Sequence, residues 1–233
     1  MSVPALLLQL TQQLLPLADE VRAQDMAAYM RNQFSFLGIA TPSRRQQAKT
    51  WWARLGRQPD ESTLLALAEQ LWLRAEREYH YIAIDLLIRF VRLLTPAAWP
   101  VLTSMLQQNS WWDSIDPLSS KVVGPVCLQW PELQPALDAW STDDNLWLRR
   151  TALLHQLGFK QQTRPEILFA YCEANLDHTD FFIRKGMAWA LREYAYTNRE
   201  AVVRWVLQHQ RRLSALTLRE MRLNLPMADA SPV

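Results

Sequence analysis

The sequence is poor in glycine and cysteine, with 5 glycines and 2 cysteines in 233 residues. No glycine-rich phosphate loop is present, which disfavours a nucleotide-binding enzyme. Cys127 and Cys172 lie far apart in apolar surroundings. We therefore expect buried free thiols rather than a disulfide or a zinc site.

Long hydrophobic runs are also missing, and no stretch approaches the roughly 18 uncharged apolar residues that span a bilayer. Residues 1–10 lack the basic start and the cleavage site of a signal peptide. We expect a cytoplasmic protein that has no membrane partner. Because 49% of the residues are hydrophobic and 21% are charged, we expect one folded domain over residues 1–225. Residues 226–233 are interpreted as a frayed tail.

Histidines are few and scattered, at positions 80, 155, 178 and 209. They form no cluster with cysteine or carboxylates, and no serine, histidine and aspartate set stands out. We therefore expect no metal and no cofactor, and the sequence offers little support for a hydrolase of the serine type.

A large excess of charge is absent as well, since the net charge is +2. The basic residues are unevenly spread, however: residues 141–225 hold 13 basic and 9 acidic side chains. Of the 25 basic residues 21 are arginine, which forks onto phosphate and stacks on flat groups. Nucleic-acid binding and ordinary solvated helix faces both remain open at this point.

Helical spacing dominates the chain, with apolar residues three and four apart, as in Ile82, Leu86 and Phe90. Helix starts are predicted from caps before proline and from capping boxes. The predicted starts are Thr41-Pro42, Thr95-Pro96, Thr163 with Glu166, and Thr217 with Glu220. The fold class is therefore all-α.

Short segments recur at spacings of about 31 to 36 residues. Residues 83–86 (AIDL) resemble residues 114–117 (SIDP), and residues 148–150 (LRR) resemble residues 183–185 (IRK). A helical pair repeated at this length predicts a HEAT-like or armadillo-type helical repeat solenoid, in a single curved domain. An ordinary orthogonal helical bundle is the alternative.

The segment 109–116 (NSWWDSID) concentrates aromatic and acidic side chains at a predicted helix start. Ser110 and Asp113 are spaced as a capping box, which predicts that Asp113 bonds backbone N–H groups. Trp112 and Asp116 are four residues apart and share one helix face, an arrangement that suits a cationic ligand. The same sequence would also fit a tryptophan in the core and a solvated aspartate, with no binding site.

Two further groups combine cations with indoles. Trp147 precedes Arg149 and Arg150, and Lys185, Trp189 and Arg192 fall on one helix face. Such groups suit a groove that follows a phosphate backbone, although tryptophans that only pack between repeats would give the same pattern.

Three segments carry a specific resemblance: 110–116 (SWWDSID), 144–152 (DNLWLRRTA) and 181–195 (FFIRKGMAWALREYA). They are similar to the signature segments of the AlkD family of bacterial alkylpurine DNA glycosylases. Residues 29–34, 36–39 and 41–45 resemble the family's opening helices, so the similarity covers about residues 20–210.

The resemblance implies a monofunctional DNA glycosylase that hydrolyses the N-glycosidic bond of cationic N3- and N7-alkylated purines. Its partner would be double-stranded DNA carrying such purines, and we expect it to act as a monomer. The implied catalytic residues are Asp116, Trp112 and Trp189. The resemblance also implies that Arg150 contacts the DNA backbone. The other candidate DNA-binding residues are Arg149, Lys185 and Arg192 from the groups of cations and indoles, and Tyr29 and Arg45 from the opening segments. The alternative is a non-catalytic HEAT-like scaffold that binds DNA or protein, and a peptide-binding solenoid is a third interpretation.

Overall fold

The computed structural model describes residues 2–223 and divides the chain into two compact units, one up to Trp130 and one from Pro131. Both units are helical, and the described residues contain no strand, only an isolated bridge between Ser35 and Glu76. The predicted all-α class is confirmed. The predicted domain boundaries, 1–225, stay a prediction, and the tail at 226–233 lies outside the described residues.

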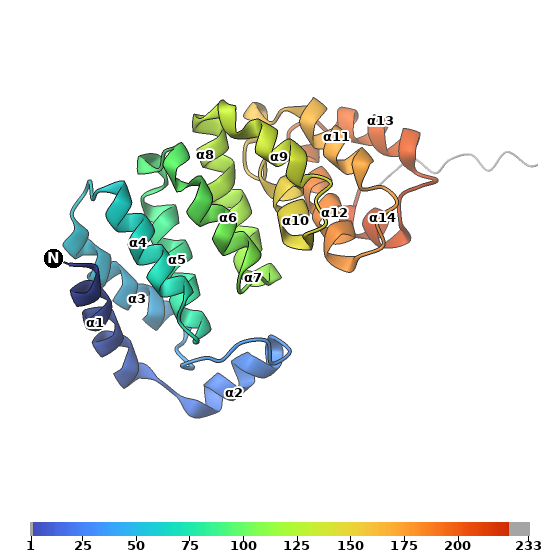
Figure 1. Ribbon diagram of the computed structural model, residues 1–233. Helices are drawn as coiled ribbons and strands as arrows, with labels where there is room; N and C mark the ends of the chain where they lie inside the picture. The colour runs from blue at the N-terminus through green and yellow to red at the C-terminus, as the bar shows by residue number, and fades with distance from the viewer. Residues whose placement is uncertain (1, 224–233) are drawn as a thin grey trace, which may run out of the picture. The chain divides into compact units, whose positions relative to one another are not determined.

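The first unit contains eight labelled α-helices in the part of the chain that is described (Figure 1). They are α1 (Val3–Leu14), α2 (Glu20–Tyr29), α3 (Thr41–Trp52), α4 (Glu61–Trp72), α5 (Arg77–Arg89), α6 (Trp99–Gln107), α7 (Trp112–Leu118) and α8 (Gly124–Gln129). A π-helical turn, Ser119–Val123, joins α7 to α8.

Apolar side chains at helical spacing form the core of this unit. Leu67 and Leu71 of α4 and Ile82 and Leu86 of α5 are all fully buried, and Figure 1 shows these two helices packed side by side. In contrast, α2 buries no residue and lies apart from them in Figure 1. This difference follows from the kind of apolar residue, because half of those in α2 are alanines and the helix has no leucine, isoleucine or phenylalanine to form a broad apolar face.

The second unit contains the remaining α-helices of the described chain. They are α9 (Gln134–Trp140), α10 (Leu146–Leu154), α11 (Pro165–Ala174), α12 (Phe181–Ala195), α13 (Arg199–His209) and α14 (Ala215–Met221). Helix α12 packs against α10, α13 and α14. Its buried face includes Ile183, Met187 and Leu191, which recur at four-residue spacing.

The repeat seen in the sequence is present in the local structure of this unit. The Asn145 side chain caps α10 by accepting from the backbone N–H groups two and three residues further along the chain. Asp180 caps α12 in the same way, 35 positions later. Arg149 donates to the carbonyl of residue 143, and Arg184 donates to that of residue 178. The same cap and the same arginine contact thus recur with the predicted period, which supports the helical-repeat prediction.

Only one of the predicted helix starts has the predicted cap. Thr95 accepts from the Ala97 N–H, although the turn it starts is 3₁₀. Thr41 lies inside α3, one residue after the actual cap position. At the other two starts the predicted capping boxes are wrong: α11 begins after Arg164, and α14 is capped by Ser214, whose hydroxyl accepts from the Thr217 N–H.

Candidate active site

Helix α7 carries the pair of side chains that the sequence singles out. It begins at Trp112 and follows the extended residue Trp111. Trp112 and Asp116 are partly exposed, whereas Ile115 and Leu118 are fully buried. The indole and the carboxylate therefore lie on the outer side of one helix, as the four-residue spacing predicts.

The last residue of α2 contacts the first residue of α7. The rings of Tyr29 and Trp112 lie edge to face, with centroids 6.3 Å apart and planes at 74°. The Tyr29 side chain is otherwise open to solvent, since the residue is 73% exposed. Three of the predicted site residues, Tyr29, Trp112 and Asp116, are thus found on these two helices of the first unit.

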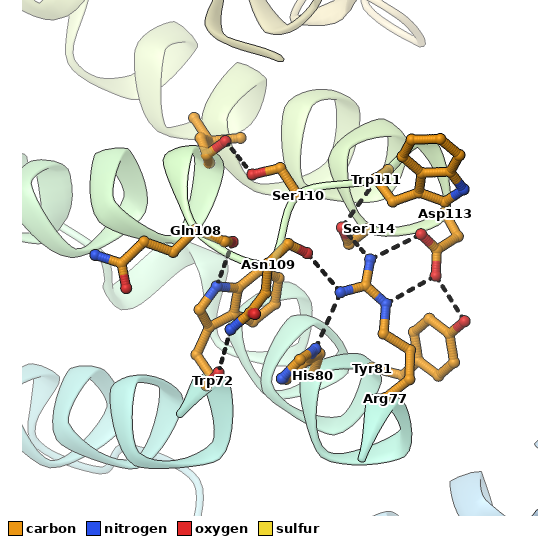
Figure 2. A network of polar contacts seen from close by, with 11 residues as sticks. Trp72, Arg77, His80, Tyr81, Gln108, Asn109, Ser110, Trp111, Asp113 and Ser114 are labelled. Atoms are coloured by element: carbon orange, nitrogen blue, oxygen red, sulfur yellow. Dashed lines mark hydrogen bonds and ion pairs between the residues drawn. The ribbon is translucent and has the colours of Figure 1, made fainter. Parts of the chain in front are cut away.

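Asp113 does not cap the helix, and the predicted capping box is wrong. Its carboxylate accepts from Arg77 Nε at 3.0 Å, from Arg77 Nη2 at 2.7 Å and from the Tyr81 hydroxyl at 2.6 Å (Figure 2). The Ser110 hydroxyl instead donates to the Leu106 carbonyl. The structural role predicted for Asp113 remains, but it is exercised through a buried ion pair whose side chains are 0% and 6% exposed.

The guanidinium of Arg77, at the start of α5, contacts several segments of the chain. It donates to the Asn109 carbonyl at 2.6 Å and to the Ser114 hydroxyl at 2.7 Å, besides Asp113 (Figure 2). It also stacks on the ring of Phe34, with 3.7 Å from the guanidinium carbon to the ring centre. Sequence reasoning missed this residue. The signal for it was its distance of 36 residues from Asp113, within the repeat period.

Two neighbours of Arg77 are titratable groups with displaced pKa values. Burial, together with the Arg77 charge, lowers the pKa of His80 to about 4, so the imidazole is neutral at pH 7. Its Nδ1 then accepts from Arg77, and its Nε2–H donates to the Arg74 carbonyl. Burial and the Asp113 carboxylate raise the pKa of Tyr81, which keeps the phenol as a donor.

The helix geometry changes directly after Asp116. Pro117 has no N–H to donate to the preceding turn, and the chain widens into the π-helical turn two residues later. The hydroxyls of Ser119 and Ser120 donate to the carbonyls of Ile115 and Asp116, at 2.6 and 2.7 Å. Turns of this kind are often found at functional sites.

In the second unit, Lys185, Trp189 and Arg192 of α12 face α14. Lys185 Nζ lies 3.6 Å from the Glu220 carboxylate, and Arg192 Nη1 donates to the Glu220 carbonyl at 2.9 Å. Trp189 and Arg192 line a cleft of about 500 Å³ together with Tyr196 and Glu220. The predicted common face of the three residues is therefore observed.

Arg149 and Arg150 of α10 are more enclosed than the sequence suggests. Arg149 donates to the carbonyls of Thr142 and Asp143 and to the Asn175 side chain, and so holds the turn before α10. Arg150 is 4% exposed and donates to the Phe182 carbonyl. By contrast, the side chain of Arg45 in the first unit is 65% exposed, and its Nε lies 3.9 Å from Asp85 Oδ2. DNA contact by these three arginines stays a prediction.

Cys127 and Cys172 are buried free thiols, as predicted. Burial raises the pKa of Cys172, so it stays protonated and unreactive. Residues 2–223 contain no group of three histidine, cysteine, aspartate or glutamate side chains that could hold a metal ion. Within the same residues, no helix is both long enough and apolar enough to cross a membrane.

A family profile described as "DNA alkylation repair enzyme" matches residues 10–224, which is most of the chain. The chain belongs to the DNA alkylation repair enzyme family. Among curated proteins, none matches it.

Solved structures of similar proteins agree with this assignment. A predicted DNA alkylation repair enzyme from Enterococcus faecalis is 31% identical, with a TM-score of 0.82 over 91% of this chain and 98% of that chain. AlkD2 from Streptococcus mutans is 16% identical, with a TM-score of 0.60 over 89% of this chain and 100% of that one. The protein smu.31 from Streptococcus mutans UA159 is 14% identical, with a TM-score of 0.59 over 88% and 100%. At these two lower identities the likeness concerns the fold, and it places this DNA alkylation repair protein among helical-repeat structures.

Proposed function

We propose that this protein is a monofunctional DNA glycosylase that acts as a cytoplasmic monomer on duplex DNA and releases purines alkylated at N3 or N7. The observation that carries the proposal is that the two carboxylates of α7 have different surroundings. Asp113 is held in a buried ion pair, while Asp116 and Trp112, four residues apart on α7, are both partly exposed. A carboxylate next to an indole on a DNA-repair protein suits a reaction that develops positive charge.

The chemistry needs little acid catalysis, because an N3- or N7-alkylated purine already carries a positive charge. When the glycosidic bond breaks, its electron pair goes to the purine, which leaves neutral, and positive charge develops on the deoxyribose. Asp116 would stabilise that charge and orient a water molecule. The water oxygen bonds to the sugar carbon, and its proton passes to the carboxylate or to solvent.

The aromatic residues would act on the same charge. The negative π-faces of Trp112 and Trp189 attract a sugar cation, at about 0.5 to 2 kcal/mol for each contact, and exclude water. Both side chains are partly exposed. Arg150, Arg149, Lys185, Arg192, Tyr29 and Arg45 would contact the DNA backbone.

The surroundings of Lys185 support a monofunctional enzyme. A lysine that cleaves the strand must reach the sugar to form a Schiff base with it. The Lys185 Nζ lies 3.6 Å from the Glu220 carboxylate and 5.2 Å from the Phe181 ring centre. Lys185 is thus engaged by Glu220 of α14 and by Phe181, and we expect an abasic site in an intact strand.

The experiment is release of free base from a methylated duplex. Purified protein is incubated with DNA containing 3-methyladenine and 7-methylguanine, and the released bases and the strand length are measured. We expect free methylpurine from the wild type, none from Asp116→Asn, and no strand cleavage before alkali. Binding of the duplex without release of base would contradict the proposal and support a non-catalytic scaffold.

A further inference from the structure

The first turn of α5 connects two segments that meet at the candidate site. On one side, Arg77 binds Asp113 and Ser114 at the start of α7. On the other side, its guanidinium stacks on Phe34, and its backbone N–H donates to the Ser35 carbonyl at 2.9 Å. Phe34 and Ser35 belong to the connection that follows Tyr29.

The next residue of α5 reinforces this connection. The buried Glu78 carboxylate accepts from three consecutive backbone N–H groups, those of Leu37, Gly38 and Ile39, at 2.9 to 3.0 Å. The loop itself is strained, because Arg31 and Asn32 both have positive φ angles, of 56° and 54°. Backbone in this region persists only where the surrounding contacts hold it.

We infer that Arg77 is a positioning residue that holds Tyr29 and Trp112 against each other and fixes the start of the helix that carries Asp116. A single planar guanidinium has five N–H donors, and here they serve α7, the turn before it and His80 while one face covers Phe34. No other side chain type offers these contacts together. The inference rests on the proposed function, because it concerns residues assigned there to excision and to DNA contact.

Arg77 also separates the roles of the two carboxylates of α7. They are three residues apart on one helix. The guanidinium and the Tyr81 hydroxyl engage Asp113, which is turned inward. Asp116 is partly exposed on α7, and it is the carboxylate that the proposed function assigns to the sugar cation.

The test uses a neutral pair, Arg77→Met with Asp113→Asn, which removes the ion pair and leaves no unmatched buried charge. The matched control is Glu61→Gln in the same unit. It weakens a carboxylate contact to Thr95, whose N–H and hydroxyl lie at 2.6 and 2.8 Å, and it touches neither α7 nor the Phe34 segment.

Two measurements are made at a temperature at which all variants are folded. The first is single-turnover release of 7-methylguanine at saturating protein, together with the Kd for the duplex. We expect the neutral pair to lose rate by about 10- to 100-fold with little change in Kd, since small displacements of reacting groups cost this much. The control should keep its rate.

The second measurement is amide hydrogen exchange, which does not depend on catalysis. Exchange should become faster at residues 112–116 and at residues 31–36 in the neutral pair, and not in Glu61→Gln. A neutral pair that excises within about twofold of wild type, or keeps its protection at both segments, overturns the inference. If the wild type releases no base, the proposed function fails, and the exchange data alone decide whether Arg77 positions the two segments.

Discussion

Replacing Asp113 by asparagine should destabilise the protein strongly, although the change removes no apolar contact. The substitution takes the negative charge away from a guanidinium that is 0% exposed and keeps the other groups in place. Asparagine can still accept from the Tyr81 hydroxyl, but it cannot accept two charge-assisted bonds from Arg77. The cost is therefore mainly that of an unmatched buried cation.

Breaking a buried pair by removing one partner costs about 3–5 kcal/mol. For a chain of 233 residues, 1 kcal/mol corresponds to a shift of about 2–4 °C in Tm. We therefore expect Asp113→Asn to lower Tm by about 6–20 °C. Adding Arg77→Met should recover at least about half of the loss, because the cation is then gone.

Circular dichroism during heating and urea titration at 25 °C measures both variants. A Tm for Asp113→Asn within about 2 °C of wild type would show that the ion pair contributes little. A double variant less stable than Asp113→Asn would also refute the reasoning, because the loss would then come from packing rather than from an unmatched charge.

Four further outcomes are expected. Asp116→Asn should lower single-turnover excision by about 100-fold or more while duplex affinity stays equal or rises, since the carboxylate acts on the transition state and repels phosphates; near wild-type rates would remove it from the mechanism. Arg150→Ala should weaken binding to all sequences and lower the salt slope by about one unit, measured by titrations across salt in a variant checked for folding. A bulky cationic N3- or N7-adduct should be excised nearly as fast as a methyl adduct, whereas 1,N6-ethenoadenine and uracil should be refused for want of a general acid, and efficient release of a neutral base would show a missed acid. Stability in urea should fall as pH decreases from about 6.5 to 4, because burial lowers the pKa of His80 and His155 to about 4 and the unfolded chain takes up protons first; a flat profile in that window would contradict the burial of neutral imidazoles.

The helical class and the repeat were predictable because they depend on periodic apolar positions and on local caps. The cap of Asp180 repeats that of Asn145, and both are readable from a few neighbouring residues. The shared face of Trp112 and Asp116 follows from the pitch of a helix in the same way.

The predicted capping boxes were wrong because other side chains bind the residues concerned, and the local sequence does not show these partners. At α11 the Gln156 side chain bonds both the N–H and the carbonyl of Arg164, which places the cap at Arg164, one residue after Thr163, and the first helical residue at Pro165. At α7 a more distant partner, Arg77, offers Asp113 stronger bonds than backbone N–H groups do. Contacts between residues more than 30 positions apart cannot be read from local spacing, and so the network around Arg77 was missed.

The π-helical turn after Asp116 bears on how the chain tolerates changes in length. Such a turn holds one residue more than an α-helical turn would, and the Gly124 N–H accordingly donates to the Ser119 carbonyl five residues earlier. A chain shortened by one residue within 119–123 could close into regular α-helix with α7 and α8 still in phase. We therefore expect this segment to be a place inside a helix where a single-residue deletion is compatible with the fold. For the same reason, a regular α-helical pitch counted from Trp112 to Gln129 misplaces every residue after the turn by about 100° around the helix axis.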